Sequence, residues 1–143
     1  MKLLQHYIAG RWVAPLNAGQ KFAVINPATE QQVAEIAMGS AADVDLAVRA
    51  ARAAFPAFAA TSLESRLDAL RRLHAVFKRR YDEMVTAITT EMGAPHDLSA
   101  NSQAECGPGH IAATIEAALT LDWETKTGSN ANVVREQIGR AHV

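Results

Sequence analysis

Cysteine is almost absent from this sequence, since Cys106 is the single thiol among 143 residues. One thiol cannot close an intramolecular disulfide, and by itself it cannot build a zinc or iron–sulfur centre. The composition therefore excludes a fold stabilised by disulfides and favours a reducing, cytoplasmic setting.

Long hydrophobic runs are also missing. No segment approaches the roughly 20 consecutive apolar residues of a membrane-spanning helix. No apolar core of a signal peptide precedes Gly10 and Arg11. We therefore expect a cytoplasmic protein without a membrane partner.

A surplus of charge of either sign is lacking as well, because 14 Lys and Arg face 15 Asp and Glu and give a formal net charge of -1. This balance creates no long-range field that would attract nucleic acid. The basic run Lys78-Arg79-Arg80 is followed at once by Asp82 and Glu83, without interleaved aromatic residues, which is typical of a solvated helix end. We expect no nucleic-acid partner.

Two β-hairpins are predicted near the amino terminus. Tyr7-Ile8 and Trp12-Val13 favour strands, and Gly10 between them can adopt the positive φ of a tight turn. Residues 22–25 and 33–36 form a second pair around Asn26-Pro27-Ala28-Thr29-Glu30, whose Asn and Pro favour a turn.

From Ser40 onward the hydrophobic period becomes helical. Ser40 and Asp43 resemble a capping box, and the first helix is expected to end near Pro56. Thr61 and Glu64 predict the start of a second helix, with a stripe that consists of Leu63, Leu67, Leu70, His74, Phe77 and Tyr81.

Two further helices are expected before the chain returns to β structure. The first runs from about Asp82 to Met92, where Gly93 and Pro95 supply stop signals. The next begins near Asp97, and Gly107-Pro108-Gly109 predicts a kink or break in it. After a polar stretch from Thr125 to Asn132, Val133-Val134 predicts a strand.

The short motifs of this chain, taken in their order, resemble the amino-terminal part of the aldehyde dehydrogenase superfamily. They are Tyr7-Ile8-Ala9-Gly10-Arg11-Trp12-Val13, Ile25-Asn26-Pro27-Ala28-Thr29, the helical run from Ala41 to Phe55, Glu91-Met92-Gly93-Ala94-Pro95 and Val133-Val134-Arg135-Glu136. Each of these motifs is weak alone, and each is a turn or a packing surface rather than a chemical group.

The resemblance implies an α/β fold, namely the amino-terminal part of an aldehyde dehydrogenase Rossmann-like cofactor domain, truncated, with two β-hairpins, several helices and then a bridging strand. It implies an oxidoreductase that converts an aldehyde to a carboxylate with NAD or NADP, through a cysteine thiolate and a thioester. It also implies a homo-oligomer, dimer or tetramer, that uses a small bridging sheet. If the chain is a complete natural protein, a non-enzymatic helical interaction module is the alternative.

No residue of this chain is assigned as catalytic, cofactor-binding or metal-binding, and the fragment is expected to be inactive. The nucleophilic cysteine of the resembled family lies far downstream, so Cys106 is interpreted as a buried or inert thiol. Gly107-Pro108-Gly109 lacks the preceding strand of a phosphate loop, and Glu91 is interpreted as a structural residue. The five histidines lack the spacing of a metal site: His6, His74, His96, His110 and His142.

The last residues depart from the resembled family. After Arg135-Glu136 the family continues with Pro and apolar residues, whereas this chain reads Gln137 and then Ile138-Gly139-Arg140-Ala141-His142-Val143. Those six residues match the translation of a widely used sequencing adapter. We therefore expect residues 1–137 to be the amino-terminal part of an aldehyde dehydrogenase domain and residues 138–143 to be a non-native tail.

Overall fold

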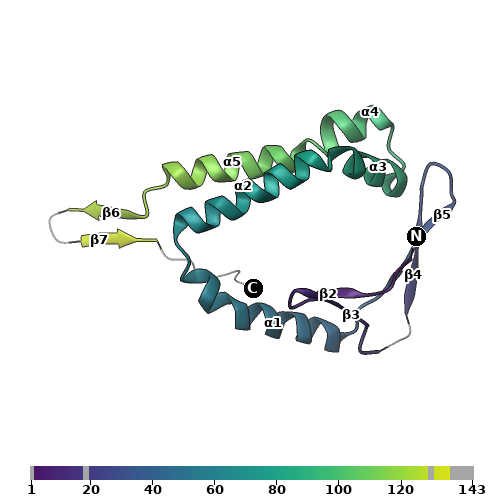
Figure 1. Cartoon of the computed structure of the whole chain (residues 1–143), viewed down its shortest axis with the longest axis horizontal. Helices are drawn as coiled ribbons and strands as arrows, with labels where there is room; N and C mark the ends of the chain where they lie inside the picture. The colour runs from purple at the N-terminus through teal and green to yellow at the C-terminus, as the bar shows by residue number, and fades with distance from the viewer. Residues whose placement is uncertain (1, 18–19, 129–130, 136–143) are drawn as a thin grey trace.

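The computed structural model describes residues 2–17, 20–128 and 131–135. Figure 1 shows an open frame, in which α2 and α5 lie side by side along one arm and α1 and the β2–β3 hairpin form the opposite arm. The elements are β1 (Lys2–Leu3), β2 (His6–Ile8), β3 (Arg11–Val13), β4 (Lys21–Ile25), β5 (Gln32–Ala37), α1 (Ala41–Ala59), α2 (Leu63–Arg79), α3 (Tyr81–Met92), α4 (His96–Leu98), a π-helical turn η1 (Ser99–Gln103), α5 (Cys106–Thr120), β6 (Glu124–Thr127) and β7 (Ala131–Val134).

The first predicted hairpin is confirmed. Strands β2 and β3 pair antiparallel, with Tyr7 opposite Trp12. Both turn residues have positive φ, 52° at Ala9 and 77° at Gly10, as a two-residue type I′ turn requires. The sequence pointed to Gly10 for this conformation but not to Ala9, whose side chain disfavours it.

The second predicted hairpin is confirmed as β4 and β5, which are antiparallel. Its turn is stabilised by the side chain of Asn26, whose Oδ1 accepts backbone N–H groups from Ala28 at 2.8 Å and Thr29 at 3.1 Å. The short strand β1 adds to the other edge of β5 in parallel. That addition was not predicted, because a strand of 2 residues leaves no period to detect.

Helix α1 begins as predicted and ends later than predicted. Ser40 is its N-cap, and Ser40 and Asp43 form the reciprocal capping box. The helix continues through Pro56 to Ala59. Pro56 and Arg52, four residues before it, are both exposed, so water can bind the carbonyl group that the proline leaves without a donor.

Helix α2 is capped by Ser62, not by Thr61 as expected. The Ser62 hydroxyl accepts the N–H of Ser65 at 3.2 Å, whereas the Thr61 hydroxyl donates to the carbonyl of Phe58. The predicted stripe holds for Leu67, which is 1% exposed. Tyr81 lies outside it, because α2 ends at Arg79 and a new helix begins at Tyr81.

Helix α3 ends as predicted at Gly93, which adopts the left-handed conformation with φ of 67°. A Cβ at Gly93 would lie 2.8 Å from the backbone nitrogen of Ala28 and 3.0 Å from Oδ1 of Asn26. The carboxyl end of α3 therefore sits directly against the β4–β5 turn. This contact closes the frame between the helical arm and the hairpins (Figure 1).

The predicted interruption near Gly107-Pro108-Gly109 exists but lies earlier, in η1 and the turn at Ala104 and Glu105. The Gly-Pro-Gly segment instead forms the first turn of α5, where a proline is tolerated because its N–H would have no helical partner. Gly107 faces α2, since a Cβ there would lie 2.4 Å from Cζ of Phe77. Helix α5 can thus approach α2 closely at this point.

The strand predicted at Val133-Val134 is confirmed as β7, but the expectation that it has no partner in this chain is wrong, because β7 pairs with a preceding strand, β6. The polar residues 124–127 form that partner, although their composition did not favour a strand. Arg135 closes the base of the hairpin through its N–H to the carbonyl of Trp123 at 2.9 Å. The proposed tail, residues 138–143, lies outside the described residues.

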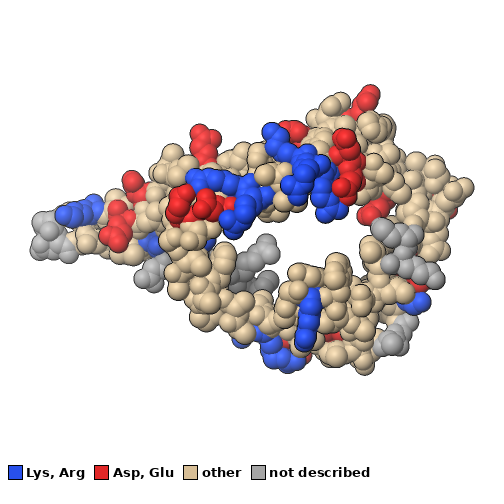
Figure 2. Space-filling view, viewed as in Figure 1, with Lys and Arg blue, Asp and Glu red and all other residues tan. Residues whose placement is uncertain are grey.

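The chain buries little of its own apolar surface. Its accessible surface is 10834 Å², whereas the usual scaling for a monomer of 15.3 kDa gives about 7,100 Å². The buried hydrophobic residues of the described chain are few: Ile8, Ala34, Leu67, Val85 and Ala104. Figure 2 shows the open gap between the two arms. The accessible surface exceeds the scaled value by about half, so much of the apolar surface is available to pack against further polypeptide.

Candidate functional site

Asp43 is the most strongly stabilised carboxylate in the described chain. It is 4% exposed. Its Oδ1 accepts the N–H of Leu16 at 2.8 Å, and its Oδ2 accepts the N–H and the hydroxyl of Ser40 at 2.8 and 2.7 Å. These bonds, led by the one from Leu16, lower the pKa of Asp43 from 3.8 to about 2.

The Asp43 cluster is structural in its geometry. The bond to Leu16 fastens the segment after β3 to the start of α1, 27 residues along the chain. The capping box revealed Asp43 from sequence alone, but no local pattern could reveal a donor so distant. A carboxylate saturated by three donors is poorly suited to accept a proton from a substrate.

A shallow groove of about 480 Å³ lies between β2 and α1, beside this cluster. His6 lines it, and its Nε2 has no hydrogen-bond partner within the described part of the chain. Tyr7 and Val44 are exposed on the same groove. The groove holds one imidazole and no second catalytic group suited to acid–base or nucleophilic chemistry, because Asp43 is already saturated.

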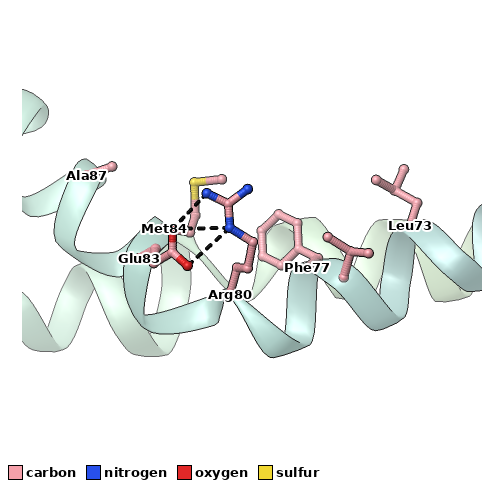
Figure 3. Close-up of a pocket in the computed structure, with 7 residues that line it drawn as sticks. Leu73, Phe77, Arg80, Glu83, Met84 and Ala87 are labelled. Carbon is pink, nitrogen blue, oxygen red and sulfur yellow. Dashed lines mark hydrogen bonds and ion pairs between the residues drawn. The ribbon is translucent and has the colours of Figure 1, made fainter.

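A second groove, of about 350 Å³, runs along α2 and α3 (Figure 3). Its floor is apolar, with Leu73, Val76 and Met84 exposed. At its rim Arg80 and Glu83 form a bidentate ion pair, in which Nη2 of Arg80 lies 2.7 Å from Oε2 of Glu83. This pair lowers the pKa of Glu83 and raises that of Arg80. Because both groups stay charged, neither is suited to exchange a proton with a substrate, and the groove is suited to packing rather than to catalysis.

Cys106 is exposed, which corrects the expectation of a buried thiol. It is the first residue of α5, and its thiol donates to the carbonyl of Ser102 at 3.2 Å. Nearby, the Tyr81 hydroxyl donates to the carbonyl of Ala100 and to Glu105. Partial burial, and then the contact with Glu105, raise the pKa of Tyr81. None of these contacts provides a base for the thiol.

The histidines and the other charged residues do not converge. Within the described residues no group of three or more His, Cys, Asp or Glu side chains could hold a metal ion. His142 lies outside those residues. The basic run is exposed at both ends, Lys78 and Arg80. Glu91, which was interpreted as a structural residue, is also exposed.

The glycine-containing segment of α5 does not fit a nicotinamide dinucleotide. A phosphate loop follows a strand and leaves space above its glycines for the pyrophosphate. Gly107 follows a π-helical turn instead, and the ring of Phe77 occupies the space beside it. These residues therefore do not form the phosphate site of a nicotinamide cofactor.

Comparison with known proteins identifies the family of this chain. The model of the aldehyde dehydrogenase family matches residues 12–143. The chain belongs to the aldehyde dehydrogenase family. The chain is 43% identical over 136 residues to 3-succinoylsemialdehyde-pyridine dehydrogenase from a Pseudomonas species, and the match covers 94% of this chain and 28% of that protein.

Solved aldehyde dehydrogenases have the same arrangement of elements. The enzyme from Bartonella henselae aligns with a TM-score of 0.86 at 32% identity, over 91% of this chain and 28% of its own. Aldehyde dehydrogenase C from Pseudomonas syringae, solved with NAD+ and octanal, aligns with a TM-score of 0.83 at 41% identity, over 87% of this chain and 25% of its own. The chain thus spans about a quarter of the length of the relatives it matches.

The aldehyde dehydrogenase relationship confirms the predicted fold class, the amino-terminal α/β part of such an enzyme. It weighs against the alternative of an unrelated helical interaction module, because helices and hairpins align together with enzymes over about nine-tenths of the chain. It also explains the excess exposed surface, since in its relatives this arrangement is one part of a chain several times longer.

Proposed function

We propose that the protein to which this chain belongs oxidises an aldehyde to a carboxylate with NAD or NADP. The match to the aldehyde dehydrogenase family over residues 12–143 carries this proposal. The relative solved with NAD+ and octanal supports both the cofactor and the substrate class. The aldehyde itself, and the choice between NAD and NADP, are left open by the residues of this chain.

We further propose that the 143 residues supply scaffold and no reacting group. Asp43 is saturated by hydrogen bonds, Cys106 lacks a base, and Gly107 is packed against Phe77. On this proposal the nucleophile and the cofactor site lie in other parts of the protein, and residues 1–137 cover a Rossmann-like cofactor domain. Residues 138–143 would be foreign to the gene.

The proposed setting of the protein is the cytoplasm, as a homo-oligomer. In the described chain no helix is long and apolar enough to cross a membrane. Self-association is supported by the exposed β6–β7 hairpin, which occupies the position of the predicted bridging strand. We propose no nucleic-acid partner, because the net charge is -1.

The proposal is tested by comparing this chain with the longer reading frame recovered by amplification of the locus from source DNA. Purified 143-residue chain should form no NADH or NADPH with aliphatic or aromatic aldehydes, whereas the longer product should. Aldehyde-dependent reduction by the chain itself, lost in Cys106→Ala, would overturn the scaffold role. A longer product that binds no nicotinamide cofactor and oxidises no aldehyde would overturn the enzymatic proposal.

A further inference from the structure

The helical arm contains one π-helical turn, η1, between α4 and α5. In an α-helix the N–H of Ala104 would donate to the carbonyl of Ala100. Here it donates instead to the carbonyl of Ser99, at 2.9 Å. Because π-helical turns are rare and occur frequently at functional sites, a contact from outside the turn is expected to stabilise this one.

Burial explains why the chain makes this turn. Ser99 is 0% exposed and Ala104 is 1% exposed, whereas Gln103 is exposed. In an α-helix of about 3.6 residues per turn, residues five positions apart are separated by about 140° around the axis, so Ser99 and Ala104 could not share the buried side. One extra residue in the turn brings them together, at the cost of the α-helical bond to the carbonyl of Ala100.

The hydroxyl of Tyr81 supplies a donor to that carbonyl. Tyr81 is the first residue of α3, and its O–H donates to the carbonyl of Ala100. Its ring contacts Phe77 edge to face, with the centroids 6.4 Å apart, which helps to fix the position of the hydroxyl. Partial burial, and then the contact with Glu105, raise the pKa of Tyr81, so the phenol keeps its proton at neutral pH.

A second acceptor competes for the same proton. Oε2 of Glu105 lies 3.1 Å from the hydroxyl oxygen of Tyr81, and a phenol has a single O–H to donate. An ionised carboxylate is a stronger acceptor than a neutral carbonyl. The proton of Tyr81 is therefore shared between Glu105 and Ala100, and the carbonyl of Ala100 has it for only part of the time.

We propose that the bond from Tyr81 to Ala100 is a latch on the π-helical turn, and that Glu105 weakens this latch, so that residues 99–105 open locally. Opening breaks the bond from Ala104 to Ser99 and separates η1 from α3, which it contacts. Helix α5 stays in place, because it packs closely along α2. Segments with few supporting contacts are the ones that open in this way. The proposal goes beyond the enzymatic one and does not depend on it.

Amide hydrogen exchange in the 143-residue chain tests the latch, with the N–H of Ala104 as the reporter. Tyr81→Phe keeps the ring beside Phe77 and removes the O–H. Exchange at Ala104 should become about tenfold faster, as expected when a buried carbonyl loses its donor, while amides within α2 and β5 should keep their rates. Measurement at about 10–20 °C, where folded proteins are usually most stable, keeps global unfolding rare. An unchanged rate at Ala104, or equal acceleration of all these amides, would overturn the proposal.

Glu105→Gln tests the competition separately. The amide is neutral and can donate to the oxygen of Tyr81, so the phenolic proton is left for Ala100, and exchange at Ala104 should slow by about threefold or more. In the Tyr81→Phe background the same substitution should not slow it, because the coupling requires both groups. Glu116→Gln, exposed on α5, is the control for removal of charge and should leave Ala104 unchanged. Slowing that persists without the Tyr81 hydroxyl, or no slowing at all, would show that Glu105 does not compete for the proton.

Discussion

The glycines of this chain allow two physical costs to be separated. Gly93 combines a positive φ of 67° with a close approach, since a Cβ would lie 2.8 Å from the backbone nitrogen of Ala28. Gly10 has a positive φ of 77° with nothing within 4 Å. Gly107 has the close approach alone, to the ring of Phe77, and Gly109 has neither. Substitution of each of these four glycines by alanine therefore introduces both costs, one of them or neither.

The magnitudes follow from these contacts. Left-handed backbone costs a residue with a Cβ about 1–2 kcal/mol, and overpacking against a rigid neighbour costs about 1–3 kcal/mol. Alanine also lowers the conformational entropy of the unfolded chain, which stabilises the folded state by about 0.4–1 kcal/mol where the folded backbone accepts a Cβ. Gly93→Ala should then lose about 2–4 kcal/mol, and Gly10→Ala about 1 kcal/mol.

The two helical sites should behave differently from these. At Gly107 the higher helix propensity of alanine offsets part of the displacement of Phe77, so the net loss should be about 0–2 kcal/mol. Gly109→Ala should stabilise α5 by about 0.5–1 kcal/mol.

The assay is urea unfolding, followed by far-ultraviolet circular dichroism at low protein concentration. Because the chain is expected to be only marginally stable, a loss of about 2–4 kcal/mol in Gly93→Ala should bring the midpoint close to zero urea, whereas the smaller loss in Gly10→Ala should leave a measurable midpoint. Protease resistance of the β4–β5 turn gives a second readout, which should fall in Gly93→Ala and not in Gly10→Ala. A midpoint for Gly93→Ala no lower than that of Gly10→Ala would show that the contact between α3 and the turn is not formed in solution.

Three further predictions concern the core, the acid response and the surface. Leu67→Ala should cost about 2–5 kcal/mol, because Leu67 is 1% exposed; the exposed Leu73→Ala, measured by the same urea titration, should cost much less. The folded pKa of Asp43 is depressed to about 2 from 3.8, so its contribution is complete above about pH 4 and is lost as the pH falls toward 2. Asp43→Asn should remove that acid-dependent loss and lower stability at pH 7, while Asp45→Asn, exposed on the same helix, should do neither. The purified chain should be marginally stable and should associate through its exposed apolar surface, which includes Leu73, Val76 and Met84; a sharp two-state thermal transition of a monomer would contradict this.

The sequence predicted those elements whose signals are local. The capping box at Ser40 and Asp43, the stop at Gly93 and both amino-terminal hairpins depend on neighbouring residues, and the structure confirms them. Helix α1 extends past Pro56 because the side chain lies on the exposed surface, which cannot be read from the proline itself.

The features that the sequence missed depend on distant partners. Residues 124–127 form a strand because β7 pairs with them and the side chain of Arg135 donates to Thr125, not because of their own preference. Leu16 donates to Asp43 across 27 residues, and β1 joins β5 from more than 30 residues away. Cys106 was interpreted as a buried or inert thiol because cysteines are usually buried, and burial is wrong, since α5 turns its first residue outward.

The contact that closes the frame also sets an order of events during synthesis. The β4–β5 turn at Asn26 is complete once Gln31 and the strand after it have left the ribosome, because its hydrogen bonds are local. Its docking partner Gly93 follows 56 residues after Ala37, the end of β5 (93 minus 37), which takes about 3–11 s at ordinary translation rates of about 5–20 residues per second. During that interval the β4–β5 turn lacks its contact with α3, and a holding chaperone that binds extended apolar segments would find its substrate there.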